Sequence, residues 1–428
     1  MSAPRQAVVL SGGGANGAYE VGVLKALLSG QSPATGLQPL VPEIFAGTSI
    51  GSYNAAFVVA QWDAHGSTAA GNLEIAWLDK LAEVAGHYGN GAFRLRGDPF
   101  DLLSPSGYLP NPLRPFRQLA EDGAFLAWDG LQRAVQFATS KQDLRARIAQ
   151  LPDFTAVVST EPWKRTIRET IDFAAIRSSS RKLRIVATNW TRGVLRIFEN
   201  LDMTDRMGPI AIEASSAIPG VFPVVLVGAE PHVDGGVLMN TPLKLGTEAG
   251  ADTLHVIYLD PDVRLIPLDA MQSTIGTIYR QQMISWANVV NDDIGDAATI
   301  NAGLTVLNRL DKEKEEEVTD PELAMLVKSL QKIGLRIKRL LKYQPLTIHR
   351  YHPRDDLSGG VLGLLNLERR HVEELIQRGF SDAILHDCAA SGCVLPGVAT
   401  PTVTVSGPTI PEQHWPAGRG AGLVPGKS

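Results

Sequence analysis

The stretch that decides the fold is Ala7-Val8-Val9-Leu10-Ser11-Gly12-Gly13-Gly14-Ala15-Asn16-Gly17, close to the N-terminus. Its first four residues form a short apolar run rich in β-branched side chains, which predicts a buried strand. The glycines that follow predict a loop. Residues 18–28 then carry Val21, Leu24 and Leu28 at the spacing of one helix face. The stretch therefore predicts a strand, a loop and a helix in succession.

A second unit of the same kind follows. Residues 43–46 predict a strand, a turn is expected at Gly47-Thr48, and a helix is expected from residue 50 toward residue 61. Strands that alternate with helices in this way are typical of a parallel sheet covered by helices. The sequence thus predicts an α/β fold with a mainly parallel central sheet.

The rest of the chain divides into three parts. We expect an α/β core over residues 5–265, a mainly helical part over 266–390 packed on that core, and a flexible Pro/Gly-rich tail over 391–428. A loop and helix insertion interrupts the core at about residues 62–161. The other expected strands and helices are listed by residue number: strands at 183–188, 194–198, immediately before Asp234, at 253–259 and at 346–351, and helices at 207–217, 271–291, 320–342 and 367–387.

Composition excludes several classes of protein. The 428 residues include 40 basic and 45 acidic side chains, so the chain lacks the basic excess of a nucleic-acid-binding protein. Mean hydropathy is close to zero. The sequence contains no uninterrupted apolar stretch of ~18 residues, so no transmembrane helix is predicted. The apolar run near the N-terminus is too short for a signal peptide. We expect a cytoplasmic or peripheral membrane protein, and the sequence carries no signature of its oligomeric state.

The cysteines and histidines do not predict a metal site. The two cysteines, Cys388 and Cys393, cannot build a disulfide framework or a Cys-based zinc site, and we expect free thiols. The nine histidines are scattered along the chain without an H-E-x-x-H pattern. We therefore expect no metal and no cofactor.

Gly47-Thr48-Ser49-Ile50-Gly51 fits the pattern G-x-S-x-G. This pattern places a serine on a tight turn between a strand and a helix, and small flanking residues let the backbone make that turn. Ser49 would then lie at a helix N-terminus, where free N–H groups favour developing negative charge. Taken alone, the pentapeptide is compatible with either a catalytic serine or an ordinary turn.

The glycine loop Gly12-Gly13-Gly14-Ala15-Asn16-Gly17 allows two interpretations. Its spacing fits the dinucleotide fingerprint G-x-G-x-x-G, but that fold needs an acidic residue at the end of the second strand, and the expected strand ends without one. The Gly-Lys-Ser/Thr of a phosphate-binding Walker loop is also absent from the loop. The alternative is an oxyanion hole, in which backbone N–H groups point at a carbonyl oxygen that becomes negative.

Asp234-Gly235-Gly236 is a candidate for the missing base. A lone Asp-Gly-Gly is usually a turn, but a serine nucleophile needs a neighbouring proton acceptor, and a buried carboxylate can supply it. His232 is the alternative base, because residues i and i+2 of a strand share a face. The sequence leaves a Ser-Asp pair and a Ser-His-Asp triad both open.

Together, these segments resemble the patatin-like phospholipase family. The matching pieces are residues 10–24, which contain the glycine loop, residues 47–55, which contain Ser49, and Asp234-Gly235-Gly236 with Asn240 and Pro242 behind it. The stretch Ala214-Ser215-Ser216-Ala217-Ile218-Pro219-Gly220-Val221-Phe222-Pro223 also resembles the family's approach to its aspartate. Each piece is ordinary, but the set in this order is highly specific.

The resemblance implies a three-layer α/β/α sandwich and a lipid acyl hydrolase that needs no metal. Ser49 would be the nucleophile and Asp234 the general base, with the amides of residues 12–15 forming the oxyanion hole. The implied substrate is a lipid or phospholipid, with a peripheral membrane contact and no nucleic acid. Asn16 departs from the family, which often has a basic residue there, so attraction of an anionic headgroup is not implied.

Other functions remain open from the sequence. The same pair could catalyse acyl transfer to an alcohol in place of hydrolysis. A lipid-binding regulator without catalysis is disfavoured by the intact Ser49, Asp234 and glycine loop. A nucleotide-dependent oxidoreductase is disfavoured by the missing ribose-binding acid.

Overall fold

The structure is a computed structural model. It describes residues 5–83, 90–96, 122–124, 127, 158–259, 274–312, 325–326, 328–329, 332–333, 345–354, 357 and 363–397. Most of the predicted insertion, most of the helix predicted over 320–342 and the tail beyond residue 397 lie outside these residues.

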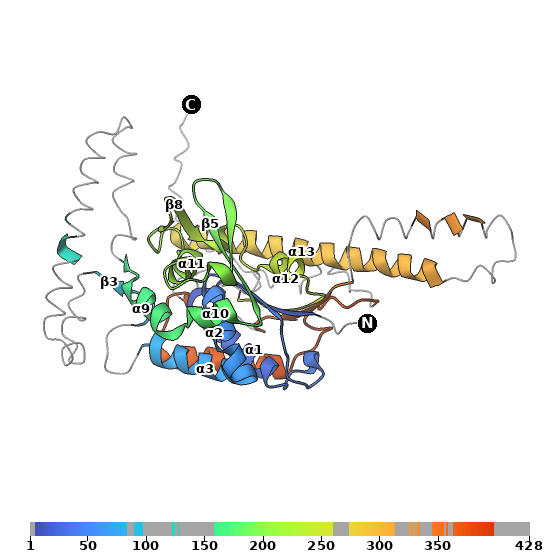
Figure 1. Cartoon of the computed structure of the whole chain (residues 1–428), viewed down its shortest axis with the longest axis horizontal. Coiled ribbons are helices and arrows are strands. Elements are labelled where there is room, and N and C mark those ends of the chain that lie inside the picture. Colours follow the sequence, from blue (N-terminus) through green and yellow to red (C-terminus); the bar gives the residue numbers. More distant parts are fainter. Residues whose placement is uncertain are drawn as a thin grey trace, which may run out of the picture.

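A mixed sheet forms the centre of the molecule (Figure 1). Within the described residues the main sheet has eight strands in the order β10-β9-β1-β2-β5-β8-β7, with β6 also paired to β5. Their bounds are β1 Gln6–Leu10, β2 Ile44–Thr48, β5 Lys182–Asn189, β6 Val194–Glu199, β7 Val225–Val227, β8 Glu230–Asp234, β9 Thr253–Ile257 and β10 Thr347–Tyr351. The five strands from β10 to β5 are parallel, whereas β6, β7 and β8 pair antiparallel. Two short strands, β3 Arg94–Leu95 and β4 Val158–Ser159, form a separate pair.

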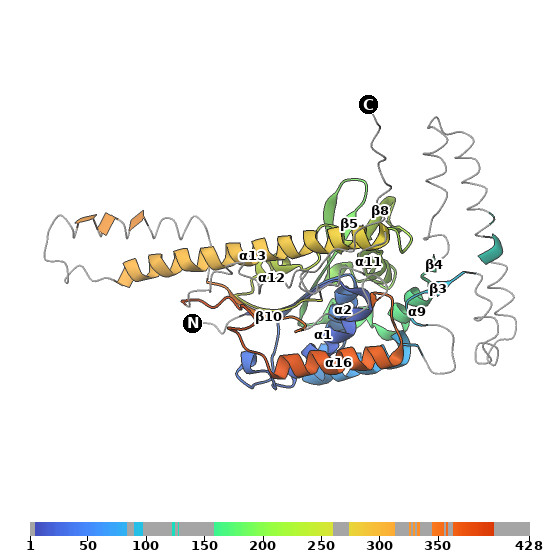
Figure 2. The same ribbon diagram turned by 180° about the vertical axis from the view of Figure 1, so that it is seen from behind.

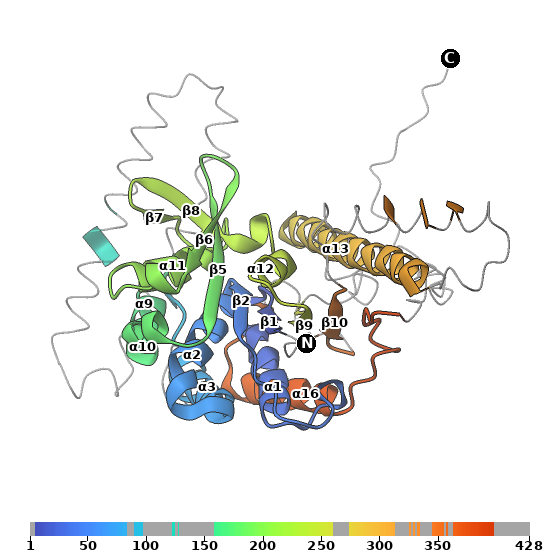
Figure 3. The same cartoon turned by 45° about the vertical axis from the view of Figure 1, so that its right-hand side comes forward.

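Helices cover both faces of the sheet, and Figure 3 shows α1 and α16 on one side with α12 and α13 on the other. The helices whose side chains share one core cluster are α1 Gly17–Leu28, α2 Ile50–His65, α3 Ala69–Ala76, α9 Glu161–Thr170, α10 Phe173–Ser178, α11 Met207–Ser215 and α16 Arg369–Ile384. The second cluster holds side chains of α12 Leu243–Glu248 and α13 Thr274–Lys312. This is the expected three-layer α/β/α sandwich with a mainly parallel sheet.

Strand β1 shows why the sequence folds this way. Val8 and Leu10 belong to the first core cluster, whereas Ala7 and Val9 belong to the second. Alternate side chains of a strand point to opposite faces, so a strand covered on both faces must be apolar throughout. The continuous run at residues 7–10 is therefore the signature of a central strand.

The two predicted strand and helix units and the helix predicted over 367–387 are confirmed with small shifts of their ends, but the helix predicted over 271–291 differs. Helix α13 continues to Lys312, past the predicted end at residue 291, and Figure 2 shows it running beyond the sheet. No proline lies between residues 274 and 312, so the polar run at 291–293 does not stop the helix. The beginning of the predicted insertion belongs to the helical layer, because Leu73 and Trp77 are fully buried in the first core cluster.

Candidate active site

Ser49 lies at a sharp turn between β2 and α2. Its φ of 55° and ψ of −125° are unusual for a residue with a side chain. A residue keeps such a strained backbone conformation only when the surrounding structure holds it there. A Cβ atom on Gly47 would run into the carbonyl of Gly51, and one on Gly51 would lie 2.7 Å from the carbonyl oxygen of Leu10. The glycines of the pentapeptide are therefore required by close backbone packing.

Hydrogen bonds fix this turn from two sides. The Ser49 amide donates to the Ser215 hydroxyl at 3.0 Å, and the Ser52 hydroxyl donates to the Ser49 carbonyl at 2.5 Å. The Thr48 hydroxyl donates to the carbonyl of Met239 at 2.9 Å, which ties the turn to the segment after Asp234. Ser49 is only 3% exposed, so its hydroxyl faces the protein interior.

Asp234 ends strand β8 next to this turn. Its Oδ1 atom accepts a hydrogen bond from the Gly236 amide at 2.7 Å, and the Ser49 side chain is close enough to hydrogen-bond to the carboxylate. Burial raises the pKa of Asp234 to about 7, and the two hydrogen bonds oppose that rise. A carboxyl group with this pKa is a stronger base than an exposed aspartate and still ionises near neutral pH.

The aspartate turn packs directly on the serine turn. A Cβ atom on Gly235 would lie 3.0 Å from the Thr48 methyl group, so a larger residue would separate the two turns. From the other side, the indole N–H of Trp286 on α13 donates to the Gly236 carbonyl. Helix α13 thereby braces the aspartate turn.

The glycine loop brings its backbone to the same place. A Cβ atom on Gly12 would lie 3.0 Å from Ser49 Cβ. The Gly12 amide donates to the Asn240 carbonyl at 3.1 Å, and the Ala15 amide donates to the Leu364 carbonyl at 2.8 Å. In the part of the chain that the structure describes, the Gly13 and Gly14 amides donate no hydrogen bond. These two amides are therefore the ones available to a ligand.

Asn16 and Gly17 belong to the start of α1. Asn16 is 7% exposed and caps α1 without a side-chain hydrogen bond. Gly17 packs against Ile50, because a Cβ atom there would lie 2.6 Å from Ile50 Cγ1. The end of the glycine motif thus holds α1 against α2, while its beginning lies beside Ser49.

The model of the patatin-like phospholipase family matches residues 8–246 of the sequence. The chain belongs to this family. The matched region contains the glycine loop, Ser49 and Asp234, and membership supports a hydrolase that acts on lipid acyl groups. No curated protein matches the sequence. Among solved structures, VipD from Legionella pneumophila is 14% identical with a TM-score of 0.29, covering 89% of this chain and 67% of that one.

An apolar cavity in this patatin-like core opens beside Ser49. Its lining comes from segments far apart in the sequence and includes Gly14, Ser49, Trp77, Phe93, Trp163, Glu213, Ile218, Phe222, Val225 and Leu364. The start of the predicted insertion supplies Trp77 and Phe93, so its aromatic residues line the cavity as well as filling the core. Such a lining suits an acyl chain.

Sequence reasoning missed several of these residues. The Leu364 carbonyl accepts a hydrogen bond from the Ala15 amide, which lies about 350 positions earlier in the chain, and no local pattern links the two residues. Glu213 is an ionisable group in a mostly apolar wall, and burial raises its pKa despite the Lys164 ammonium group 3.5 Å away. Helical spacing on α11 alone did not reveal that this side chain faces the cavity.

His232 is not connected to Ser49 or Asp234 by a hydrogen bond among the described residues. It is 2% exposed, and its Nδ1 atom lies 2.9 Å from the Glu230 carbonyl oxygen. Among the described residues no hydrogen bond joins His232 to Ser49 or to Asp234. The geometry thus offers no proton path through this imidazole.

The candidate site around Ser49 contains no group of metal ligands within the described residues. One set of histidine and cysteine side chains does come together elsewhere, around Cys388, and the sequence spacing did not suggest it. Among the described residues, no helix has both the length and the apolar character needed to cross a membrane.

Proposed function

We propose that the protein hydrolyses lipid acyl esters through a covalent acyl-enzyme on Ser49, with Asp234 as the general base. The observation that carries the proposal is the pairing of a serine on a strained turn with a buried carboxylate whose pKa is about 7. A phospholipase A or lysophospholipase type of reaction fits this pairing.

In the first half of the reaction, Ser49 Oγ adds to the ester carbonyl carbon while Asp234 takes the hydroxyl proton. The carbonyl oxygen becomes negative, and the Gly13 and Gly14 amides donate hydrogen bonds to it. Donors held in place before the reaction cost no reorganisation when the charge develops. When the intermediate collapses, the ester C–O bond breaks and the leaving alcohol takes the proton from Asp234.

In the second half of the reaction, a water molecule takes the role that the Ser49 hydroxyl had in the first. Asp234 takes a proton from the water, whose oxygen adds to the acyl carbon. The bond to Ser49 Oγ breaks, Ser49 regains a proton from Asp234, and the fatty acid leaves. The carboxylate thus returns to its starting state after each turnover.

The apolar cavity supports a long-chain acyl group as the part of the substrate that is bound. Aromatic and aliphatic side chains from α9, from the helical turn Trp77–Leu81 and from the segment after α11 line it. Since esters of such acids reside in membranes and micelles, we expect turnover at a lipid surface through a peripheral contact.

The test is product analysis with a panel of phospholipids, lysophospholipids and triacylglycerols, with and without an added alcohol acceptor. We expect free fatty acid, labelling by a fluorophosphonate probe, and loss of both in Ser49→Ala. Ser29→Ala, at the exposed end of α1, is the matched control and should behave like the native protein. Turnover that persists in purified Ser49→Ala would falsify the assignment. Acyl transfer to the alcohol in place of release would identify a transferase with the same dyad.

A further inference from the structure

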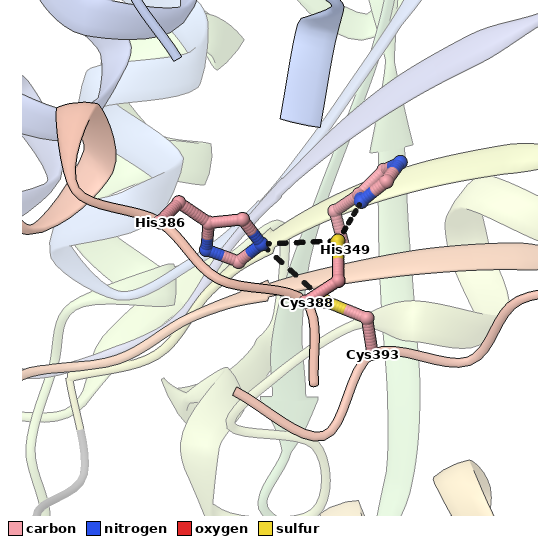
Figure 4. Close-up of side chains that lie close together, drawn as sticks. All are labelled: His349, His386, Cys388 and Cys393. Carbon is pink, nitrogen blue, oxygen red and sulfur yellow. Dashed lines mark hydrogen bonds between the residues drawn. The ribbon is translucent and has the colours of Figure 1, made fainter. Parts of the chain in front are cut away.

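Two histidines and two cysteines converge in the C-terminal part of the chain, outside the active site (Figure 4). His349 lies on the edge strand β10, whereas His386, Cys388 and Cys393 lie in the segment after α16. Their ligand atoms all lie within 4.8 Å of one another. The proposed reaction makes no use of these side chains.

The separations between these atoms are those of a metal coordination shell. Cys388 Sγ lies 3.4 Å from His349 Nδ1 and 3.5 Å from His386 Nε2, and Cys393 Sγ lies 3.4 Å from the same Nε2 atom. In a tetrahedral zinc site, Zn–S and Zn–N bonds of about 2.3 and 2.0 Å put each sulfur about 3.5 Å from each nitrogen. Three measured separations therefore match the zinc geometry before any ion is placed.

Hydrogen bonding alone does not account for the arrangement. A neutral imidazole nitrogen has either one N–H or one lone pair, so it forms one good hydrogen bond along its axis. Two sulfur atoms nevertheless converge on His386 Nε2. A cation between them would take the nitrogen lone pair and both sulfurs at once.

The surrounding backbone holds the cysteines in place. Ile348 and Val394 exchange two backbone hydrogen bonds of 2.8 and 2.9 Å, which attach the loop to β10 beside His349. Within the loop, the Cys393 amide donates to the Cys388 carbonyl at 2.9 Å.

Outer contacts of the kind that orient metal ligands are also present. The Arg350 amide donates to Cys393 Sγ at 3.3 Å, and the Ser391 hydroxyl lies 3.5 Å from His386 Nδ1. His349, His386 and Cys393 are each less than a tenth exposed. The four groups thus form a shielded site near the protein surface.

We propose that His349, His386, Cys388 and Cys393 bind one zinc ion in a closed tetrahedral site. Two imidazoles with two thiolates are a common donor set for structural zinc, and the soft sulfur ligands disfavour magnesium and calcium. Each thiol releases a proton to solvent on binding, so the two thiolates balance the charge of the ion. The longest separation in a closed tetrahedral site of this kind is the sulfur–sulfur one, about 3.8 Å, so ligand pairs that lie up to 4.8 Å apart move closer when the ion binds.

With four protein ligands, the site has no open position for a substrate, so its role is structural. The ion links β10 to the segment after α16. That helix packs on α1 through close backbone contacts at Gly22 and Gly379, and α1 begins at the glycine loop. Zinc binding therefore stabilises the C-terminal segment that covers this side of the core.

Metal content and cobalt spectroscopy of the reduced full chain test the proposal. We expect close to one zinc ion per chain by elemental analysis. After chelation, addition of Co²⁺ should produce the visible bands of a tetrahedral ion with a thiolate-to-cobalt charge-transfer band, and Zn²⁺ should abolish them. The chelated protein should melt at a lower temperature, and added Zn²⁺ should restore the melting temperature.

Variants separate the zinc site from its alternatives. Cys388→Ser with Cys393→Ser should lose the zinc and the cobalt spectrum, whereas His352→Gln, on the same segment as His349, should keep both. Because the double variant could fail to fold, the cobalt spectrum of the native sequence is the deciding measurement. A reduced native chain that binds neither Zn²⁺ nor Co²⁺ would overturn the proposal, as would a Cys388–Cys393 disulfide, detected by mass, in a protein that takes up no metal after reduction.

Discussion

The serine turn and the aspartate turn of the active site are prepared for chemistry in different ways. Ser49 is set by backbone geometry, with a positive φ, glycines on both sides and amides nearby. Asp234 has an ordinary backbone, and its reactivity comes from burial, which raises its pKa to about 7. The parallel half of the sheet thus leads into the proposed nucleophile, and the antiparallel half carries the proposed base.

Because of this difference, the two turns should respond to different perturbations. Changes that keep the shape but remove the charge should affect the aspartate half most. Substitutions that add a Cβ atom to a glycine should affect the serine turn and the neighbouring glycine loop, here called the serine half, most. Variants of each kind can sharpen or break the distinction.

The largest effect is expected from Asp234→Asn. The amide keeps the shape and can still accept the hydrogen bond from Gly236, but it cannot take the serine proton. We expect kcat for ester hydrolysis to fall by about 100-fold or more, as for loss of a general base. Steady-state kinetics with a soluble p-nitrophenyl ester measure it, and a decrease of less than about tenfold would mean that another group accepts the proton.

The same variant should become more stable at high pH. The folded-state pKa of Asp234 is raised from 3.8 to about 7, so the folded chain keeps a proton that the unfolded chain has released between these values. The contribution of Asp234 to the free energy of unfolding is therefore fully present below pH 3.8 and is lost as the pH rises through about 7. Asp234→Asn removes that loss, so its melting temperature should exceed the native one at pH 8 and approach it below about pH 4. Equal melting temperatures at pH 8 would show that burial does not control this carboxyl group.

The next effect is the pH dependence of turnover. Only the ionised Asp234 carboxylate can take the serine proton, so kcat/KM should reach a plateau above pH 7 and fall about tenfold for each pH unit below it. Initial rates between about pH 5 and about pH 9 measure the profile. A rate that stays constant down to about pH 5, as expected for a carboxyl group with the ordinary pKa of 3.8, would contradict the role given to burial.

A smaller effect is expected in the serine half, from Gly14→Ala. Gly14 has a φ of 56°, and a Cβ atom there would meet the carbonyl group of Leu364. We expect a stability loss of about 1 to 3 kcal/mol and a roughly tenfold lower rate, because the loop must shift away from the oxyanion position. The pH midpoint of turnover should stay unchanged.

Gly36→Ala is the matched control for that variant. Gly36 has a similar φ of 64°, but an added Cβ atom would meet nothing within 4 Å. It should therefore lose about 1 kcal/mol through backbone strain alone and keep its activity. Equal effects of the two variants on the rate would mean that the contact with Leu364 does not position the loop.

The parts of the site that could be predicted are those indicated by neighbouring residues in the sequence. Residues 47–51 form a continuous motif between a strand and a helix, so the position of the serine turn follows from adjacent residues. The apolar run at residues 7–10 placed the central strand in the same way. The family match covers residues 8–246, which include Ser49 and Asp234.

Tertiary contacts decided what the sequence could not. We expected the amides of residues 12–15 to form the oxyanion hole together. The Gly12 and Ala15 amides already donate to the carbonyls of Asn240 and Leu364, so we now propose only Gly13 and Gly14 as donors. The proposed zinc ligands were missed for the same reason. The two cysteines were considered without His349, which reaches them only because β10 pairs with β9 at the edge of the sheet.

The smallest effect is expected from His232→Asn, which tests whether the aspartate half contains a second base. The asparagine amide can occupy the place of the imidazole Nδ1 atom beside the Glu230 carbonyl, so the local structure should persist. Since no hydrogen bond within the described residues links His232 to Ser49 or Asp234, kcat should change by less than about threefold and the pH midpoint should not move. A loss of about 100-fold in His232→Asn, in a protein with native melting behaviour, would instead make the imidazole the base and leave Asp234 to orient it.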